Sequence, residues 1–429
     1  MENKHYKNII LGAGISGLAA GIEFKKEGQS CVILEKENNP GGLCQSVKVG
    51  ECEFDFGPKI LLLDDSENSK TILSYLDGNY LQYPISEGAY LSEYGLLGFP
   101  LQRCLYCLPE VEKKKILDDI EKIRKSPKEI TDYKAWLINA FGEYFCKKVL
   151  FPYEEKKWQI KLDKLDYKWA LNRPIRVDYD EIKLGAISKL PPKGNYFYPK
   201  TGSITTLVDG MVKHSCSIEY NQEVININTK EKFVETKTHR YYYEKLVSTI
   251  PINIFLNLIE DKSQSFEDSD KFLHGLGILV VNLVFKGNYD LQGSAIYFPE
   301  KKYIFRRVSV LQNLCPALSR DGYTPLQVEV SIKGKINTKE YTDRILKDLM
   351  SIKQFSVLGK PELINCLNID FAYPLPSTGL EEYIKNIHTF YEKIEIYHCG
   401  RGGNYVYCNL DKAYKQGSDL AKKIIGDIK

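Results

Sequence analysis

The sequence predicts an α/β fold in which a parallel βαβ sheet is combined with an inserted helical domain and a mixed or antiparallel substrate sheet. Three observations support this prediction. Near the N-terminus an apolar strand is followed by a glycine-rich turn, a helical pattern and a second strand. The stretch 100–167 is mostly helical in pattern, whereas 265–373 alternates apolar and polar residues as strands do. At 429 residues the chain is long enough for two or three packed units.

The N-terminal turn has the spacing of a dinucleotide-binding loop. Gly12, Gly14 and Gly17 follow the first strand as GxGxxG, and the next strand ends at Glu35. Gly12 permits the tight turn, Gly14 lets the backbone approach a pyrophosphate, and Gly17 allows close packing of helix on strand. The helix N-terminus faces the phosphates, and Glu35 can accept hydrogen bonds from ribose hydroxyls. This part is therefore predicted to be a Rossmann-like sheet that binds a dinucleotide.

Composition argues against several other classes of protein. The formal net charge is only +3 and no basic run is free of acidic neighbours, so no nucleic-acid partner is expected. The apolar run Ile278–Phe285 is too short to span a bilayer, and no apolar leader precedes the first strand, so a cytoplasmic protein is expected. Eleven cysteines are scattered singly except Cys104 and Cys107, and one CxxC pair lacks the four ligands of a structural zinc site. Free or buried thiols and no metal site are expected.

The residues after Glu35 distinguish between dinucleotides. The run Asn39-Pro40-Gly41-Gly42-Leu43 resembles the second glycine signature of the large FAD family that includes amine oxidases, protoporphyrinogen oxidase, phytoene desaturases and UDP-galactopyranose mutase. The resemblance implies a GR2-type FAD-binding domain with FAD as the cofactor and with the Gly-Gly turn beside its ribityl and phosphate arm. The further cofactor contacts that it implies are Lys36, Gly42, Leu43, Gly57, the backbone of Val224, Gly400 and Arg401.

The same resemblance implies that the FAD-binding domain is discontinuous. Its later pieces are expected at a strand over Glu223–Asn228, a strand over Ile394–His398 and a final helix over Leu410–Ile425. The predicted division assigns 1–98, 183–260 and 385–429 to the FAD-binding domain, 99–182 to the helical substrate domain, and 261–384 to the substrate sheet.

Five further motifs, in order along nearly the whole chain, resemble those of UDP-galactopyranose mutases, especially the eukaryotic type. They are Phe151–Trp158, Trp169 with Arg173, Tyr196–Gly202, the block from Phe305 to Glu329, and Gly400–Tyr407. The resemblance implies that N5 of reduced flavin attacks the anomeric carbon of a UDP-sugar and expels UDP, after which the ring opens and recloses as a furanose. It implies a nucleoside-diphosphate sugar as substrate, a place in polysaccharide biosynthesis, NAD(P)H as a candidate external reductant, and a homodimer as a candidate assembly.

Such chemistry needs two arginines to hold the diphosphate, both as a binding group and as a leaving group. Arg173 and Arg307 occupy the matching positions, and Arg176 and Arg306 are alternatives because a shift of one alignment position would exchange them. A surface arginine without a ligand is the competing interpretation for each, since exposed arginine is common.

Aromatic and amide side chains complete the candidate substrate site. Tyr407 matches a tyrosine that contacts the diphosphate, and Tyr153 or Trp158 could stack on a base or sugar. Tyr373 is added as a substrate contact, and Asn409 stands where bacterial mutases have an acidic residue. Aromatic residues that only fill the core are the alternative at this density of aromatics.

One departure from the family keeps a second function open. Gly57-Pro58 is followed by Lys59, where the family has a histidine near the flavin, so Lys59 is a candidate catalytic residue. It could hold a water or tune the flavin in an FAD-dependent oxidoreductase of the protoporphyrinogen oxidase or amine oxidase type. A flavoprotein that has lost its activity is a third interpretation. Paired arginines with polar aromatics would indicate a diphosphate site, and an apolar aromatic cage would indicate an amine or porphyrinogen site.

Overall fold

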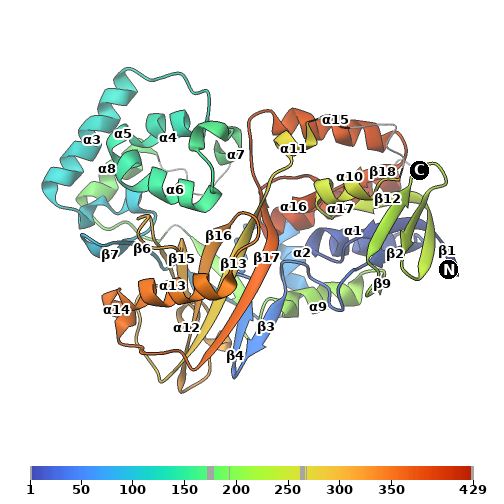
Figure 1. Ribbon diagram of the computed structural model, residues 1–429, viewed down its shortest axis with the longest axis horizontal. Helices are drawn as coiled ribbons and strands as arrows, with labels where there is room; N and C mark the ends of the chain where they lie inside the picture. Colours follow the sequence, from blue (N-terminus) through green and yellow to red (C-terminus); the bar gives the residue numbers. More distant parts are fainter. Residues whose placement is uncertain (1, 172–177, 193, 261–265, 267, 427–429) are drawn as a thin grey trace.

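The computed structural model describes residues 2–171, 178–192, 194–260, 266 and 268–426. Three parts lie next to one another (Figure 1). The first is a mixed sheet with helices that contains both ends of the chain, the second is a helical part formed by residues between 110 and 187, and the third is a second, mainly antiparallel sheet. This α/β arrangement confirms the predicted fold class.

The first sheet is built around the N-terminal strand β1. Its strand order is β10-β11-β12-β1-β2-β9, and β18 also pairs with β12. The centre of the sheet is parallel: β1 pairs with β2 and β12, β2 pairs with β9, and β12 pairs with β18. Beyond β12 the sheet continues as an antiparallel meander through β11 and β10. The strands are β1 Glu2–Leu11, β2 Cys31–Leu34, β9 Ser217–Glu219, β10 Val224–Asn228, β11 Phe233–Thr236, β12 His239–Ser248 and β18 Ile396–His398.

Helices cover both faces of this sheet because the central strands are apolar on both sides. Ile10 packs under α1, α9 and α17, and Ile9 and Leu11 pack under α10 and α15. Such double burial is typical of parallel sheets and explains the continuous apolar run at the end of β1. The helices of this part are α1 Ile15–Lys26, α2 Glu67–Ser74, α9 Thr205–His214, α10 Ile252–Leu258, α15 Leu380–Glu392, α16 Gly400–Gly403 and α17 Leu410–Gly426.

The second sheet has the strand order β17-β13-β16-β15-β14-β6-β7. Successive side chains along each strand point to opposite faces of this sheet. In β16, Val328 and Val330 pack under α13 and α14, whereas Gln327 and Glu329 lie on the opposite face. Its elements are β6 Glu87–Leu91, β7 Gly95–Gly98, α11 Ser269–Phe272, β13 Gly275–Lys286, β14 Ala295–Tyr297, β15 Arg307–Val310, α12 Leu311–Leu314, β16 Tyr323–Ile332, α13 Thr338–Met350, α14 Lys353–Ser356 and β17 Leu363–Pro374.

In the described part of the chain, two small two-stranded sheets accompany the two seven-stranded sheets. Strand β3 (Ser46–Val49) pairs with β4 (Cys52–Asp55), and β5 (Tyr80–Pro84) pairs with β8 (Asn195–Pro199). The Gln327 side-chain amide donates to the backbone oxygen of Asp55 over 2.8 Å. The β3–β4 pair therefore lies against the face of the second sheet that α13 leaves uncovered.

The helical part packs around its own aromatic core. Trp136, Phe145 and Trp158 are buried there, together with Leu276 and Leu375 from the second sheet. The part consists of α3 Glu110–Lys125, α4 Tyr133–Phe141, α5 Glu143–Phe145, α6 Phe151–Trp158, α7 Lys168–Leu171 and α8 Tyr179–Ile187.

Some elements cross the predicted division of the chain. Residues 87–98, assigned from sequence to the FAD-binding domain, form β6 and β7 and pair with β14 of the second sheet. Helices α8 and α15 continue across the predicted boundaries at 182 and 384. The short strands β6 and β7 have no sequence pattern that shows which sheet they join, because packing between residues that are distant in the chain determines which strands pair.

Candidate functional site

The glycine-rich turn after β1 has the geometry of a phosphate-binding loop. Gly12 has a φ of +96°, and a Cβ on Gly17 would lie 2.0 Å from the backbone oxygen of Gly12. A Cβ on Gly14 would meet nothing within 4 Å, so this backbone is open on its outer side. Glu35 is buried and accepts a 2.7 Å hydrogen bond from the backbone N–H of Ala13. Open backbone at a helix N-terminus next to a buried carboxylate suits a dinucleotide.

The second glycine signature folds directly onto the first. The Gly41 N–H donates to the Ala13 oxygen over 2.8 Å, and a Cβ on Gly42 would lie 3.4 Å from the Cα of Gly14. Leu43 follows half-buried. Lys36 is exposed, with its Nζ 3.4 Å from Glu37 Oε1. The two glycine turns therefore form one continuous backbone surface.

The middle and C-terminal pieces reach the same surface. A Cβ on Gly400 would lie 2.5 Å from Ser16 Oγ at the start of α1, so this turn also needs glycine. The Gln222 N–H donates to the Glu35 oxygen over 2.8 Å, and Val224 begins β10 two residues later. The candidate cofactor residues from the beginning, middle and end of the chain are thus brought together, and they fit a bound FAD.

A cluster of cations surrounds one carboxylate on the open face of the second sheet. Arg307 and Glu329 are directly paired in the β15–β16 ladder. Arg307 donates from Nε to Glu329 Oε2 over 2.6 Å and from a terminal nitrogen to Oε1 over 2.9 Å. The guanidinium of Arg306 lies 3.2 Å from the same carboxylate and 3.3 Å from the hydroxyl of Tyr373, to which it donates. Two buried arginines therefore share one carboxylate.

The electrostatics of this cluster leave hydrogen-bonding capacity unused. Burial alone would raise the pKa of Glu329, but Arg307 and Arg306 outweigh it and hold the pKa at about 2. Glu329 is therefore ionised at neutral pH. Among the described residues, Nε of Arg306 is buried and has no hydrogen-bond acceptor. Buried donors are nearly always paired, and this atom is available to an acceptor from a bound molecule.

Lys59 lies at the edge of the same cluster. Its Nζ donates to the Phe56 backbone oxygen over 2.8 Å. Burial lowers the pKa of Lys59, and Arg401 lowers it further, whereas Cys44, Glu329 and Asp55 raise it. Gly57 has a φ of +78°, and a Cβ there would lie 2.8 Å from Glu329 Oε1. The loop thus reaches the arginine cluster only because residue 57 is glycine.

Aromatic side chains from three elements form a wall beside the cations. The rings of Tyr373 (β17) and Tyr407 are stacked, with centroids 5.0 Å apart and planes inclined by 10°. Trp158 at the end of α6 meets the Tyr407 ring edge-on at 5.9 Å. The guanidinium of Arg401 lies 5.2 Å from the Tyr373 ring and 5.6 Å from the Tyr407 ring. Tyr153 lies one turn before Trp158, and burial raises its pKa.

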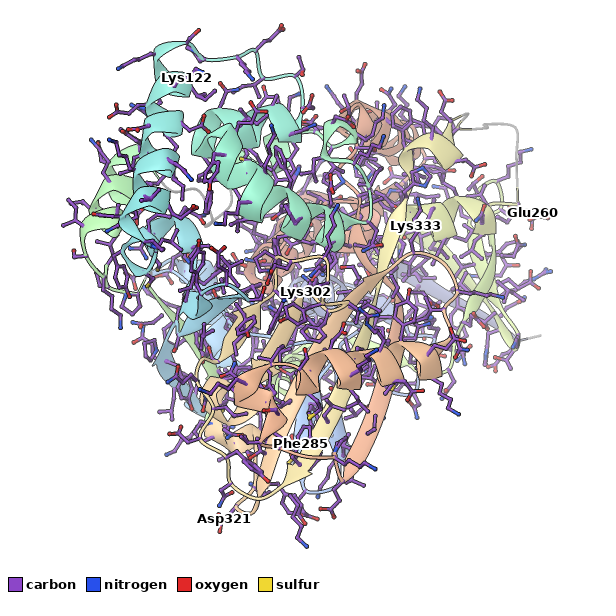
Figure 2. All side chains as sticks on the ribbon, turned by 60° about the vertical axis from the view of Figure 1, so that its left-hand side comes forward. Lys122, Glu260, Phe285, Lys302, Asp321 and Lys333 are labelled. Atoms are coloured by element: carbon purple, nitrogen blue, oxygen red, sulfur yellow. The ribbon has the colours of Figure 1, made fainter. Side chains whose placement is uncertain are left out.

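The structure describes only some of the remaining predicted residues. Arg173 and Arg176 lie outside the described residues. Asn409 is half-buried immediately before α17, and its backbone oxygen accepts from Ala413. Figure 2 labels Lys302 in the β14–β15 connection, close to the helical part, whereas Phe285 and Asp321 lie toward the opposite end of the sheet. Arg306 contacts Tyr373 of β17, and the backbone oxygen of the preceding residue, Phe305, accepts from Lys156 of α6, so the arginine pair lies where the second sheet meets the helical part.

Sequence reasoning did not select three residues that support the arginines. Tyr297 donates to Glu87 over 3.0 Å, and the Arg307 guanidinium lies 5.9 Å from the Tyr297 ring. Lys156 on α6 donates to the backbone oxygens of Phe298, Glu300 and Phe305, which flank the connection to Arg306. Burial lowers the pKa of Lys156 to about 7, although Glu300 and Asp348 raise it. Only Lys156 carried a sequence signal, its place in the Phe151–Trp158 motif.

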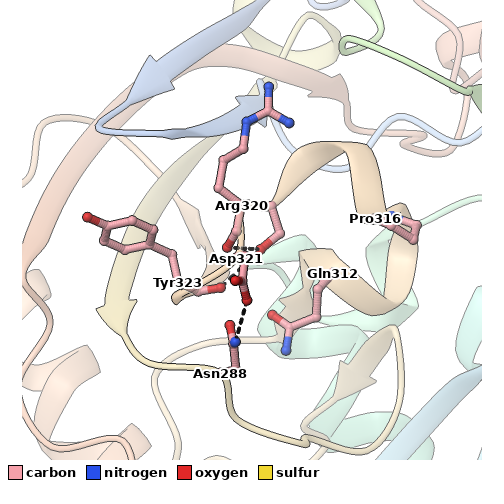
Figure 3. A pocket seen from close by; sticks show the side chains of 7 residues that line it. Asn288, Gln312, Pro316, Arg320, Asp321 and Tyr323 are labelled. Carbon is pink, nitrogen blue, oxygen red and sulfur yellow. Dashed lines mark hydrogen bonds between the residues drawn. The ribbon is translucent and has the colours of Figure 1, made fainter.

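A surface hollow lies elsewhere on the molecule. It has a volume of about 290 Å³ and is formed by turns at the tip of the second sheet (Figure 3). The Asn288 amide donates to Asp321 across it over 2.6 Å. None of the predicted site residues lines this hollow, and the open polar turns give no enclosed surface for a flavin or a nucleotide.

Comparison with known sequences finds similarity in short segments. A family model described as an NAD(P)-binding Rossmann-like domain matches residues 10–76. A 1-hydroxycarotenoid 3,4-desaturase of Flavobacterium sp. (strain P99-3) is 40% identical over 57 residues, 13% of this chain and 12% of its own. A 4,4'-diapophytoene desaturase (4,4'-diaponeurosporene-forming) of Staphylococcus aureus (strain COL) is 35% identical over 77 residues, 18% of this chain and 15% of its own. The chain thus matches less than a fifth of the length of these curated relatives.

Solved structures match the whole chain. A reduced UDP-galactopyranose mutase superposes with a TM-score of 0.90 at 19% identity, covering 98% of this chain and 94% of its own. A proposed protoporphyrinogen oxidase from Exiguobacterium sp. 255-15 gives 0.77 at 16% identity over 99% of both chains. A putrescine oxidase bound to putrescine gives 0.69 at 15% identity, covering 99% of this chain and 100% of its own. At such identities these similarities establish a shared fold.

No helix in the described parts of the chain is both long and apolar enough to cross a membrane. The N-terminal match shows an NAD(P)-binding Rossmann-like domain over residues 10–76, and the whole chain shares its fold with solved structures of a UDP-galactopyranose mutase, a proposed protoporphyrinogen oxidase and a putrescine oxidase.

Proposed function

We propose that the protein is an FAD-dependent nucleotide-sugar mutase that interconverts the pyranose and furanose rings of a nucleoside-diphosphate sugar. The observation that carries the proposal is the unused Nε of buried Arg306 within a cluster that has more cations than carboxylates. An anion with several oxygen atoms would satisfy both the donor and the charge, and a diphosphate is such an anion. The resemblance in fold to UDP-galactopyranose mutase supports the same proposal.

The charge of the described site favours an anionic substrate. Arg307, Arg306 and Lys59 hold the pKa of Glu329 low, and the Arg401 guanidinium lies beside Tyr373 and Tyr407. Asp55 and Glu87 are nearby, but burial raises the pKa of both carboxyl groups, and their hydrogen bonds only partly offset it. Positive charge in a buried site is costly without a counter-ion, so binding of a diphosphate would relieve this excess.

The reaction requires the diphosphate to leave as an anion and to return. Donors that are already in place stabilise the charge that develops on the leaving group, without reorganisation at the moment of reaction. In the proposed arrangement Arg306 and Arg307 bind the diphosphate, and Arg173 and Arg176, which lie outside the described residues, are proposed as further partners. Glu329 positions Arg307 through two hydrogen bonds and is not itself a substrate group.

The aromatic wall would orient the rest of the substrate. Tyr373, Tyr407 and Tyr153 lie at the junction of α6, β17 and the turn after α16, and the fully buried ring of Trp158 packs edge-on against Tyr373 and Tyr407. Such groups can stack on a base or sugar and hydrogen-bond its hydroxyls. Bound reduced FAD would supply the nucleophilic N5 for the anomeric carbon. NAD(P)H as reductant, a homodimeric assembly and Asn409 as a sugar contact remain proposals of the same kind.

Product analysis tests the function directly. The purified protein, loaded with FAD and reduced with dithionite, is incubated with separate UDP- and GDP-sugars, and the products are separated and identified by NMR. A furanose product that appears only with reduced protein, without net oxidation of the sugar, is expected. If the folded, FAD-loaded protein neither binds nor converts any of these sugars in either redox state, the proposal is wrong.

An FAD-dependent oxidoreductase is the second candidate, and Lys59 is the observation that favours it. Its ammonium lies where the mutases have a histidine, and the desaturases found among the curated relatives show that related sequences serve redox reactions. Consumption of O₂ or turnover of NAD(P)H that depends on an added amine, porphyrinogen or polyene would support this candidate. The Lys59→His variant separates the two, because it should improve a mutase-like site and impair one in which lysine holds a water.

A further inference from the structure

Two cysteines that are distant in sequence have their thiols in contact. Cys31 begins β2 and Cys216 immediately precedes β9, and their Sγ atoms are 3.0 Å apart. The next residues of the two strands, Val32 and Ser217, are directly paired in a parallel ladder. Neighbouring strands run about 4.8 Å apart. The Cα atoms of the two cysteines, one step back, therefore lie within the range of roughly 4.4–6.8 Å that a disulfide requires.

Helix α1 is shaped around this sulfur pair. A Cβ on Gly21 would lie 3.0 Å from Sγ of Cys216 and 2.4 Å from Oγ of Ser215. Glycine is unfavourable inside a helix, and here it leaves the space that the sulfurs occupy. Cys31 and Cys216 keep exposed fractions of 8% and 9%, at the end of the sheet where β9 is the last strand (Figure 1).

We propose that Cys31 and Cys216 form an oxidative modification site at which a peroxide converts the thiol pair into a disulfide between β2 and β9. The sulfur of one cysteine attacks the O–O bond of hydrogen peroxide, which gives a sulfenic acid and one water. The sulfur of the second cysteine then attacks the sulfenic sulfur, forming the S–S bond and releasing a second water. Two thiols lose two electrons and two protons in total, and one peroxide is reduced to two waters.

The geometry requires only a small movement. The sulfurs must approach from 3.0 Å to a bond length of about 2.05 Å, which side-chain rotation can supply. Burial raises the pKa of the Cys31 thiol, and its hydrogen bond with Cys216 raises it further. Little thiolate is therefore present at neutral pH, so the pair stays reduced unless the oxidant is in excess.

The disulfide would join two segments that carry part of the candidate cofactor site. Strand β2 ends next to Glu35, whose N–H donates to the oxygen of Glu219, the last residue of β9, over 2.9 Å. The two cysteines are 185 residues apart in sequence, so the link closes a long loop. Long closed loops remove much entropy from the unfolded chain, so oxidation should raise the melting temperature by several degrees.

The experiment treats the full-length protein with hydrogen peroxide and maps it by non-reducing peptide mass spectrometry. A peptide linking Cys31 to Cys216 is expected, together with the loss of two of the eleven thiols titrated in denaturant. The melting temperature should rise and return to its first value with dithiothreitol. Cys31→Ser and Cys216→Ser should each abolish these changes, whereas Cys104→Ser, which removes one cysteine of the CxxC pair, should retain them.

Three results would overturn the proposal. The first is a folded wild-type protein that yields no Cys31–Cys216 peptide after peroxide treatment. The second is a link that forms only between Cys104 and Cys107, and the third is oxidation of Cys31 to sulfinic acid in place of the disulfide. Peptide mapping of the wild type needs no variant, so a serine variant that folds poorly does not affect this decision.

Discussion

Substitution of Arg306 by lysine probes the donor on which the proposed function depends. The side chain is 5% exposed, and its guanidinium contacts both Glu329 and Tyr373. Lysine keeps the positive charge but removes the planar fork and the unused Nε. The change therefore separates hydrogen-bond geometry from net charge.

The expected size of the effect follows from the number of donors lost. An ammonium at this depth can keep the contact with Glu329 or turn toward a diphosphate, but it cannot do both. A hydrogen bond to a charged group contributes about 1.5–3 kcal/mol. Loss of one such bond to a diphosphate should weaken UDP binding roughly 10–100-fold. The fold should survive, because the ion pair of Arg307 with Glu329 is retained.

The assay is a titration of UDP into FAD-loaded, dithionite-reduced protein, followed by the change in the flavin spectrum. Arg344→Lys is the matched control, since Arg344 pairs with Asp348 on the exposed side of α13 with 51% of its side chain accessible. The control should bind UDP as the wild type does. An Arg306→Lys protein with normal FAD content and unchanged UDP affinity would refute the assignment of this donor to a diphosphate.

Three further predictions concern the glycine turns and the carboxylate. Gly14→Ala should leave the melting temperature of the apoprotein unchanged but lower FAD affinity, because the added Cβ meets nothing within 4 Å until a pyrophosphate is bound. In Gly17→Ala the Cβ would lie 2.0 Å from the backbone oxygen of Gly12, so the melting temperature and the FAD affinity should both fall. Differential scanning fluorimetry and flavin retention measure this, and equal FAD affinity in Gly14→Ala would contradict it. Gly57→Ala should destabilise the protein by about 1–3 kcal/mol and weaken UDP binding, because its Cβ would crowd Glu329 at 2.8 Å. Gly78→Ala, which has a φ of +75° but open space around it, should leave UDP binding unchanged. Glu329 has its pKa lowered from 4.5 to about 2, so its stabilising contribution is complete above pH 4.5 and is lost as the pH falls toward 2. Glu329→Gln should therefore cost about 3 kcal/mol at neutral pH, and melting curves that show the same deficit at pH 2 would disprove the linkage.

Local signals in the sequence predicted the elements that hold the cofactor. The second strand, predicted to end at Glu35, is β2, which ends at the preceding residue, and the final helix predicted over Leu410–Ile425 is α17. These elements are marked by glycine spacing and by apolar periodicity, which act within a few residues. The strands β6 and β7 lie in the range predicted for the FAD-binding domain but join the second sheet, because β6 pairs with β14, which lies about 200 residues away, and β7 pairs with β6.

The site shows the same distinction. The motif that contains Arg306 and Arg307 was recognisable from sequence, but Glu87 and Lys156 were not predicted as supports for it. Lys156 is recognised only through three backbone oxygens of a connection more than 140 residues away. The contact of Cys31 with Cys216 is of this kind as well, since it depends on which strand stands next to β2.

The sequence by itself determined the dinucleotide turn and the acidic end of β2, because both depend on short-range spacing that backbone geometry requires, whereas the discontinuous FAD-binding domain was implied by the family resemblance. The tertiary structure decided that two adjacent arginines share one carboxylate and leave a buried donor unused. It also decided that Gly57 brings Lys59 to that carboxylate. These contacts depend on strand register and on bringing together residues that are distant in the chain. Their interaction energies depend on how deeply each group is buried, and no local sequence pattern indicates that burial.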